Sequence, residues 1–534
     1  MVADCHPSTG LLWYKMVVFD GARLFVGVAE GGGMELGDFA WQPDENSAIP
    51  YYRQLMVYVR DQIVTGALRP GTRLPPQRAL AARFGLNRST VVAAYQELQA
   101  DGLVMGRMGG GTIVVGPDSD ADGASKVFKW HEMLDRGTYV HDKSLAAEVA
   151  RARGHPDIIP LAQGELAPDL KPTAVIQELV HSVPITAASL SYEDRHGYRP
   201  LREAIAQHMT NRGAPTDMSG VLTLAGAQQG LYIICRGLLQ PGDTVVVEAP
   251  SYLLTLDVLR SAGLRVLRAP LDQHGLMVDR LEELLARQRV AMIFTTPAYQ
   301  NPTGSLLAAN RRARILDLCE RYHVPLVEDD VYGELGFAGA APPPLYAQDR
   351  RGLVIYVSSI SKSVAPSLRV GWLVAPPYLV TRLAETKYQV QFGCSAIPQW
   401  VAAEWLDQGH HRAHIAHVTR ALQERRDILE DGLRRHFGPL LEWVQPLGGF
   451  HLWAEVHAPV SSTALFHAAL RTGLAIKPGS LYGMPPGHTW IRLSFQYASL
   501  DNLRAAPRVL RQVIEDVIQT DQDNEGYPAE TAAM

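Results

Sequence analysis

The sequence predicts a small helical domain that ends in a β-hairpin, followed by a large α/β domain with a mostly parallel sheet. Three observations carry this prediction: the length, a basic segment near residue 50, and a later alternation of helical patterns with short apolar runs. At 534 residues the chain exceeds what one hydrophobic core usually supports. Its composition, 47% hydrophobic and 20% charged, is that of an ordinary globular protein.

The apolar stretch near the N-terminus does not predict a membrane span or a signal peptide. It covers residues 11–29 and is interrupted by Lys15, Asp20 and Arg23. We therefore expect a cytoplasmic protein with no membrane partner. The four cysteines lack the spacing of a metal site or a disulfide framework, so we expect no metal and only packed thiols at Cys5, Cys235, Cys319 and Cys394.

Residues 50–115 form a basic segment on an otherwise acidic chain. They contain eight arginines, no lysine and three acidic residues, so they carry a net charge of +5 while the remainder carries −10. A basic module on an acidic body is typical of an attached nucleic-acid-binding domain. Charge alone leaves a second interpretation open, a solvated basic surface.

Three short helices are predicted inside this segment. The first covers residues 51–64, where apolar residues recur at helical spacing before a glycine. The second follows Pro75-Pro76 and closes at Gly85. The third begins at the cap-rich run 87–90 and ends before Gly102. Two short helices joined by a tight turn indicate a helix-turn-helix.

A β-hairpin is predicted directly after these helices. Residues 103–115 give two β-prone runs around three glycines at 109–111, which is the pattern of a wing with a flexible tip. A three-helix bundle with a hairpin is also compatible with a protein-interaction module. Arginines at the start of two helices and on the hairpin favour DNA instead.

The head segment resembles the GntR family of winged-helix regulators. The resemblance is carried by LRPGTRLPPQRALAARFGLNRSTVVAAYQELQADGLV, which begins at residue 68, and by GGGT at residue 109. It implies binding to double-stranded operator DNA. The residues implied in that contact are Arg78 and Arg88 at two helix starts, with Ser89, Thr90 and Arg107 nearby.

The second part of the chain alternates helical patterns with short β-branched runs. These runs predict strands in an α/β domain, and they are VVVEAP at 245, MIFTTP at 292, VPLVEDD at 324 and LVIYVSS at 353. Ligand sites in open α/β sheets lie just beyond the carboxyl ends of the strands. Five polar clusters occupy such positions: AGAQQG at 225, EAPSY at 248, PAYQNPTG at 297, EDDVY at 328 and SSISKSVAPSLRVGW at 358.

Each cluster alone is usually a turn or a solvated loop, but together and in this order they resemble the fold-type I aminotransferases that use pyridoxal 5′-phosphate (PLP). The resemblance runs from about residue 157 to 515. It implies two catalytic residues, Lys362 as the Schiff-base anchor and Asp329 under the pyridine nitrogen. It also implies that Asn301 and Tyr332 bind the ring hydroxyl and that Tyr252 stacks on the ring.

The same resemblance implies a phosphate site, a subunit contact and an effector site. The phosphate is assigned to a helix start and its neighbours: Ala227, Gln228, Ser359 and Arg369. Tyr192 matches the tyrosine that reaches this phosphate from the partner subunit, although its flank EDRHG departs from the usual pattern. Arg492 in WIRLSF matches the arginine that binds the carboxylate of an amino acid.

A GntR-type head on such a body is the arrangement of the MocR subfamily of bacterial regulators. The resemblance implies a head-to-tail homodimer whose binding of PLP and of an amino acid or amine effector controls transcription, with the protein on the nucleoid when it binds DNA. A catalytically active aminotransferase with a DNA-binding head is the alternative, and residual transamination is compatible with either. A scaffold that only retains the fold is the third interpretation.

The domain boundaries predicted from these patterns divide the chain into five parts. Residues 1–47 form an N-terminal extension with no assigned function, in which Met34 is an alternative start. The parts that follow are the winged helix-turn-helix at 48–115, a linker at 116–157, the PLP-binding domain at 158–518 and a polar tail at 519–534.

Overall fold

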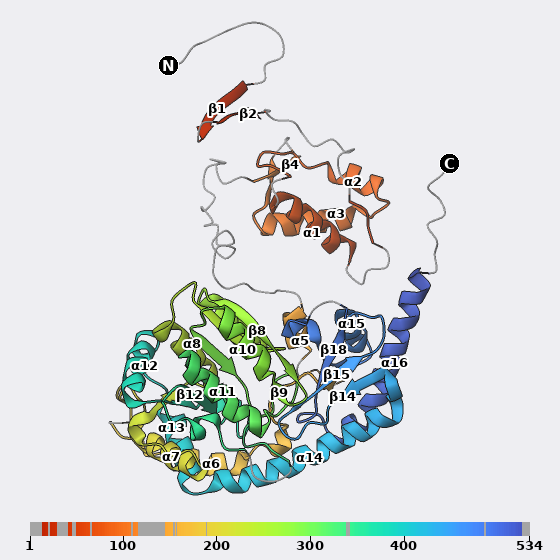
Figure 1. Ribbon diagram of the computed structural model, residues 1–534. Helices are drawn as coiled ribbons and strands as arrows, with labels where there is room; N and C mark the ends of the chain where they lie inside the picture. The colour runs from red at the N-terminus through yellow and green to blue at the C-terminus, as the bar shows by residue number, and fades with distance from the viewer. Residues whose placement is uncertain are drawn as a thin grey trace. The chain divides into compact units, whose positions relative to one another are not determined.

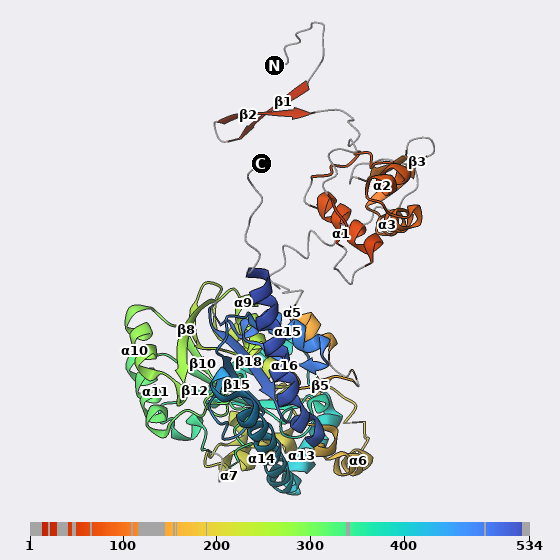
Figure 2. The ribbon, with the colours of Figure 1, turned by 90° about the vertical axis from the view of Figure 1, so that its right-hand side faces the viewer.

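The structure is a computed structural model whose contacts divide the chain into two compact units, Met1–Lys129 and Trp130–Met534 (Figures 1 and 2). Each unit is described by itself. The residues that the structure describes are 13–19, 22–28, 41–44, 50–64, 67–107, 111–115, 145–152, 155, 157–187, 189–337, 342–484 and 487–525.

The first unit contains the predicted three helices and hairpin. Its elements are α1 (Tyr51–Val64), α2 (Gln77–Arg83), α3 (Arg88–Ala100), β3 (Val104–Arg107) and β4 (Gly111–Val114). Helix α3 begins where it does because the Asn87 side chain accepts a hydrogen bond from the Ser89 amide at 3.0 Å. Val91, Tyr95 and Leu98 of α3 recur at helical spacing and are buried on one side of the helix. The helix-turn-helix and the antiparallel hairpin are confirmed.

Part of the N-terminal extension belongs to the core of this unit. The extension contains a two-stranded antiparallel hairpin, β1 (Trp13–Phe19) and β2 (Ala22–Val28). Further along, Trp41 is buried and lies edge-on to the Phe84 ring, with 5.1 Å between ring centroids. The amide of Asp44 donates to the Gln54 side chain of α1 at 3.0 Å. No role could be assigned to this segment from the sequence, whereas in the structure Trp41 packs in the core of the first unit.

The second unit is built on an eight-stranded mixed sheet with the order β6-β13-β12-β11-β10-β7-β8-β9. The central strands β8, β7, β10, β11 and β12 are parallel, whereas β13 runs against both neighbours. The predicted α/β class is confirmed. The strands are β6 (Val221–Leu224), β7 (Thr244–Ala249), β8 (Arg265–Asp272), β9 (Gly275–Leu276), β10 (Met292–Thr295), β11 (Leu326–Asp329), β12 (Val354–Ser359) and β13 (Gly371–Val374).

Helices cover both faces of this sheet (Figure 1). Val245 and Val247 of β7 pack with α8 (Ala227–Leu238), α9 (Leu253–Ser261) and α12 (Pro377–Val390). Val246 points to the other face, with α10 (Val278–Arg287) and α11 (Ala309–Tyr322). Because successive side chains alternate across a strand, an unbroken apolar run satisfies both faces. A further core joins α6 (Thr173–His181), α7 (Arg199–Asn211) and α13 (Ala396–Asp407).

The C-terminal part adds a four-stranded antiparallel sheet, β14-β15-β18-β17. Its strands are β14 (Leu441–Trp443), β15 (His451–Val456), β17 (Lys477–Pro478) and β18 (Thr489–Ser494). Helices α14 (His410–Phe437), α15 (Ser462–Arg471) and α16 (Leu500–Glu525) pack on it. A short parallel pair joins β5 (Ile159–Pro160) to β16 (Leu474–Ala475).

Two segments that the sequence analysis set outside this domain continue its helical structure. Helix α5 (Leu145–Arg151) falls in the predicted linker, yet Leu145 and Val149 are buried in the C-terminal core. Helix α16 extends to Glu525, into the predicted polar tail. Among the residues described, no helix is long and apolar enough to cross a membrane.

The buried position of Trp41 gives a first prediction. Replacing Trp41 with alanine removes the indole that packs on Phe84, so we expect the first unit to lose about 3 kcal/mol of stability. Hydrogen exchange measured by mass spectrometry on the full-length protein should show faster exchange in α2 and α3. Exchange in β11 and β12 serves as the internal control and should not change. Equal protection of α2 and α3 in both proteins would contradict the packing role.

Candidate functional site

The structure gathers most of the predicted cofactor residues around one cavity of about 170 Å³. They come from the start of α8, the segments after β7 and β10, the end of β11, and the end of β12 with the loop that follows. Since carboxyl ends of parallel strands meet at one edge of a sheet, residues far apart in sequence become neighbours there. Those lining the cavity are Ala227, Gln228, Tyr252, Asn301, Asp329, Tyr332, Ser359, Lys362 and Arg369.

Asp329, the last residue of β11, presents a buried carboxylate to this cavity. Its Oδ1 atom is buried and has no hydrogen-bond partner in the part of the chain described. Burial, together with the nearby charges of Asp330 and Glu248, raises the pKa of Asp329 to about 7. A buried acceptor without a partner is costly, so this atom indicates a place for a ligand that donates a hydrogen bond or carries positive charge.

The two acidic neighbours of Asp329 are compensated inside the protein. Glu328 accepts hydrogen bonds from the amides of Leu345 and Tyr346 at 2.7 and 2.9 Å. Asp330 accepts from the Arg212 guanidinium at 2.7 Å. Of the three consecutive acids, only the middle one faces the cavity with an unsatisfied oxygen.

Lys362 lies in the loop after β12, and its amine faces the same cavity. It is half-buried, and its Nζ donates to the carbonyl of Gly164 at 2.6 Å. The next residue, Ser363, is held from the other side, because its carbonyl accepts a hydrogen bond from His414 Nε2 of α14 at 2.8 Å. Burial lowers the pKa of His414 to about 4, so this histidine is a neutral donor. The first contact fixes the lysine side chain, and the second restricts the backbone beside it.

A cradle suited to an anion forms at the N-terminus of α8. The helix begins after Gly226, whose φ of +97° favours glycine, and a Cβ at that position would lie 2.5 Å from Arg369 Nη2. The same Nη2 donates to the Ala225 carbonyl at 2.6 Å, so the guanidinium is held beside the helix start. Ser359 lines the same cavity, and its Oγ accepts a hydrogen bond from the Ser361 amide two residues later at 3.0 Å. Helix N–H groups, a hydroxyl and an arginine together fit a phosphate.

Arg492 of β18 reaches the edge of this site through Asn301. Its side chain is 1% exposed, and its Nη1 donates to Asn301 Oδ1 at 2.9 Å. Nη2 donates to the Ala162 carbonyl at 3.2 Å, while the buried Nε has no hydrogen-bond partner among the residues described. An arginine that is buried without a carboxylate partner is suited to take one from a ligand.

Sequence reasoning missed several residues that support this site. His451 lies 3.3 Å from the Tyr332 hydroxyl, and burial beside Arg492 holds its pKa well below the usual range. Glu248 is buried and accepts hydrogen bonds from the Thr296 amide and the Gln300 side chain. A lone histidine in an apolar strand carries no signal in the sequence. The buried glutamate was visible inside EAPSY but had no separate interpretation.

Tyr192 lies apart from the cavity. Its side chain is 88% exposed, and its ring lies 5.9 Å from that of Phe392, which is 59% exposed. Within a single chain, therefore, the structure does not bring Tyr192 to the residues with which it was grouped.

The predicted DNA-contacting residues gather at the helix-turn-helix. Arg78 is in the first turn of α2, and Arg88 is the first residue of α3. Arg78, Arg88 and Ser89 are exposed, and Thr90 is half-buried. Arg107 ends β3, and its side chain lies outside the described residues. The two arginines thus stand at successive helix starts, where the backbone N–H groups also favour phosphate.

Comparison with known families assigns both units. The family described as aminotransferase class I and II matches residues 156–508. The chain belongs to this family. The family described as bacterial regulatory proteins, gntR family, matches residues 51–114. The chain is therefore a MocR-like fusion of a GntR-type helix-turn-helix, a DNA-binding module, with an aminotransferase-like domain, as the resemblances implied.

Relatives of both kinds are similar to this chain. The uncharacterized HTH-type transcriptional regulator YisV of Bacillus subtilis is 37% identical over 478 residues, which cover 89% of this chain and 99% of that protein. The multiple substrate aminotransferase of Thermococcus profundus is 30% identical, with a TM-score of 0.69 over 74% of this chain and 100% of that chain. LysN, the α-aminoadipate aminotransferase of Thermus thermophilus, crystallised with N-(5′-phosphopyridoxyl)-L-leucine, is 28% identical, with a TM-score of 0.68 over 74% and 100%.

The raised pKa of Asp329 gives a prediction about stability and pH. The folded, cofactor-free protein holds this proton until the pH passes about 7, whereas the unfolded chain releases it near pH 4, so the stability that the proton contributes is lost as the pH rises through 7. Asp329→Asn should therefore stabilise the cofactor-free protein more at pH 8 than at pH 4, by up to about 4 kcal/mol. Urea unfolding of both proteins at both pH values measures this difference. The same difference at pH 8 and pH 4 would contradict the burial of an ionisable carboxyl.

Proposed function

We propose that this protein is a transcription regulator whose head binds operator DNA and whose body binds PLP together with an amino acid or amine effector. The observation that carries the proposal is the buried, unpaired Asp329 oxygen facing the same cavity as Lys362, next to an anion cradle. The role in transcription is supported by the GntR-type helix-turn-helix. It is also supported by the similarity to the regulator YisV, which extends over 99% of that protein's length.

The residues around the cavity fit PLP in charge and in hydrogen bonding. Asp329 would pair with the protonated pyridine nitrogen, which satisfies its orphaned Oδ1. The cradle of Ala227, Gln228, Ser359 and Arg369 would hold the phosphate. When bound, PLP supplies an electron-withdrawing ring conjugated to a carbonyl carbon that amines attack.

The remaining cavity residues orient the ring and the reacting amine. Lys362 would hold the cofactor covalently through its amine, which the Gly164 carbonyl now keeps inside the site. Asn301 and Tyr332 would bind the ring hydroxyl, and Tyr252 would lie on the ring face. An effector carboxylate would take up the hydrogen bonds of Arg492, which already reaches Asn301.

We also propose a head-to-tail homodimer in which Tyr192 contacts the phosphate of the partner subunit. Its 88% exposure and the exposed ring of Phe392 beside it support a protein contact at this place. We expect the regulator to act in the cytoplasm, on the nucleoid when the head binds DNA.

An active aminotransferase with a DNA-binding head is the second candidate, because the catalytic pair Lys362 and Asp329 and the carboxylate arginine Arg492 are all present. Turnover with a set of amino acids, measured beside gel shifts with and without PLP, separates the two functions. Sustained turnover without sequence-specific DNA binding would favour the enzyme.

The role of Lys362 predicts the colour of the protein. The wild type incubated with PLP should be yellow after gel filtration, and Lys362→Ala should lose the visible absorption band because the covalent attachment needs the amine. Lys171→Ala, which removes an amine that pairs with Glu165 and does not line the cavity, serves as the control and should keep the band. A colourless wild type that takes up no PLP would refute the cofactor assignment.

The role of Arg88 predicts a loss of DNA affinity. Arg88→Ala should weaken operator binding about tenfold or more, since a base or phosphate contact of an arginine contributes about 1–3 kcal/mol. The affinity for the intergenic DNA upstream of the gene can be measured by fluorescence anisotropy at several salt concentrations. Arg60→Ala, which removes the same charge from α1, is the matched control and should change affinity far less. Unchanged affinity and salt slope in Arg88→Ala would overturn the assignment.

A further inference from the structure

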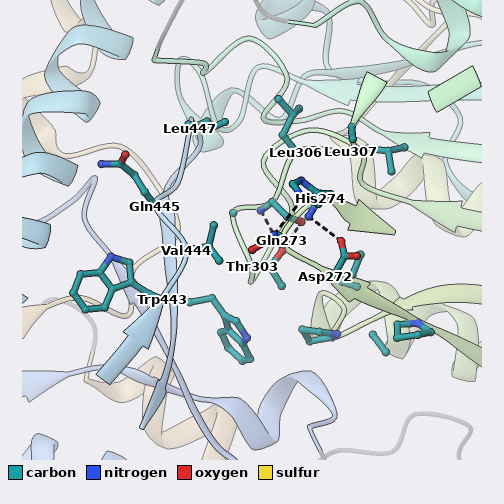
Figure 3. Close-up of a pocket in the computed structure, with 18 of the residues that line it drawn as sticks. Asp272, Gln273, His274, Thr303, Leu306, Leu307, Trp443, Val444, Gln445 and Leu447 are labelled. Carbon is teal, nitrogen blue, oxygen red and sulfur yellow. Dashed lines mark hydrogen bonds between the residues drawn. The ribbon is translucent and has the colours of Figure 1, made fainter. Parts of the chain in front are cut away.

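A second cavity, of about 710 Å³, lies between the large sheet and the C-terminal sheet. One side is formed by residues 272–274, from the end of β8 to the turn before β9, and by the loop at 303–307 (Figure 3). The other side is formed by residues 443–447, which begin with the last residue of β14. No residue that lines it lines the cofactor cavity as well. Its volume falls in the range of small-molecule sites in proteins, about 300–1,000 Å³.

The lining of this second cavity is mainly apolar and aromatic. Trp453 of β15 and Trp490 of β18 are stacked, with ring centroids 5.5 Å apart and planes 10° from parallel. Aliphatic and thioether side chains add to this surface: Leu306, Leu307, Val444, Leu447 and Met484. Two indoles and several aliphatic groups give an apolar ligand a large contact area.

Two carboxylates in the lining give the cavity a negative end. Glu442 of β14 and Glu455 of β15 are directly opposite each other in the sheet, and Glu455 is in turn opposite Trp490. Like charges at directly opposed positions are unfavourable unless a cation lies near them. The neighbours that the structure gives them are histidines, His457 beside Glu442 at 3.0 Å and His488 beside Glu455 at 2.7 Å.

Of the other charged groups of the lining, Asp272 is matched inside the protein and Arg312 is matched only in part. The carboxylate of Asp272 is paired with both terminal nitrogens of Arg311 at 2.6 Å. The guanidinium of Arg312 donates to the Pro343 carbonyl and lies 4.0 Å from the buried Glu328, whereas its buried Nε and Nη1 atoms have no hydrogen-bond partner among the described residues. The carboxylates of the lining that are not paired with an arginine are Glu442, whose side chain is exposed, and Glu455, each beside one histidine. Glu455 is also directly opposite the Trp490 indole.

We propose that this cavity is a second small-molecule site, which takes an amphipathic organic cation: an apolar or aromatic body with an ammonium group. The body would fill the apolar surface around Trp453 and Trp490. The ammonium would lie between the two glutamates and the indole, where Coulombic and cation–π attraction act together.

The second cavity and the cofactor cavity are lined by residues of the same backbone segments. Thr303 and Gly304 line the second cavity, two and three residues after Asn301. Trp453 is directly opposite Arg492 in the sheet. The turn is packed tightly, since a Cβ on Gly304 would lie 2.7 Å from the His451 carbonyl. A bound cation would therefore contact the elements that hold Asn301 and Arg492.

Titration of the full-length protein with three fluorescent probes of one size tests the proposal. They are a dansyl amide with a trimethylammonium tail, a neutral dansyl amide and a dansyl amide with a carboxylate tail. The quaternary nitrogen cannot condense with an aldehyde, so the probe does not report on cofactor chemistry. We expect saturable energy transfer from tryptophan with the cation, and about tenfold tighter binding of the cation than of the anion.

Variants at the cavity give the matched controls. Glu455→Gln should reduce the preference for the cation about fivefold and leave the neutral probe unaffected. Val444 is 52% exposed, so Val444→Trp can fill the opening without disturbing the core and should abolish binding, whereas Val444→Thr should retain it. Equal binding by both Val444 variants, a preference for the anionic probe, or no saturable binding of any probe would overturn the proposal.

Discussion

The candidate cofactor site depends on one buried carboxylate oxygen, Asp329 Oδ1, that has no hydrogen-bond partner among the described residues. Glu328, Asp329 and Asp330 follow one another at the end of β11, where neighbouring side chains point to opposite faces of the sheet. Glu328 and Asp330 therefore share a face, and there backbone amides and Arg212 compensate them. Asp329 alone points to the cavity. Three adjacent buried acids cannot all lack partners, so the compensation of Glu328 and Asp330 on one face allows Asp329 to keep an unsatisfied oxygen on the other.

The sequence was informative where structure depends on local chemistry. The Asn87 cap predicted the start of α3, and the apolar runs predicted β7, β10, β11 and β12. Polar residues directly after those strands could be grouped before any contact was known, since the ends of parallel strands meet at one edge. The strand order and the reversed direction of β13 had no such signal, because they depend on pairing between distant segments.

The residues that sequence reasoning missed share one property, long separation along the chain. Gly164 contacts Lys362 across 198 positions, and Glu148 of α5 contacts His467 across 319. Neither contact leaves a periodic pattern, so α5 was assigned to a linker. Trp41 was missed for a similar reason, since a single tryptophan outside a recognised motif does not reveal which core it enters. The partner of Tyr192 is not in the same chain under the proposed dimer, and no intrachain contact could indicate it.

Helix α14 is hydrogen-bonded both to the loop that follows β12 of the large sheet and to the connection between β14 and β15 of the C-terminal sheet. With 28 residues it is about 42 Å long. Near its start, His414 holds the carbonyl beside Lys362, and further along Arg426 donates to the Pro446 carbonyl in the connection between β14 and β15. The same helix thus touches the lysine loop and the sheet that carries Arg492. A movement of α14 would therefore act on both places, because each is hydrogen-bonded to the same helix.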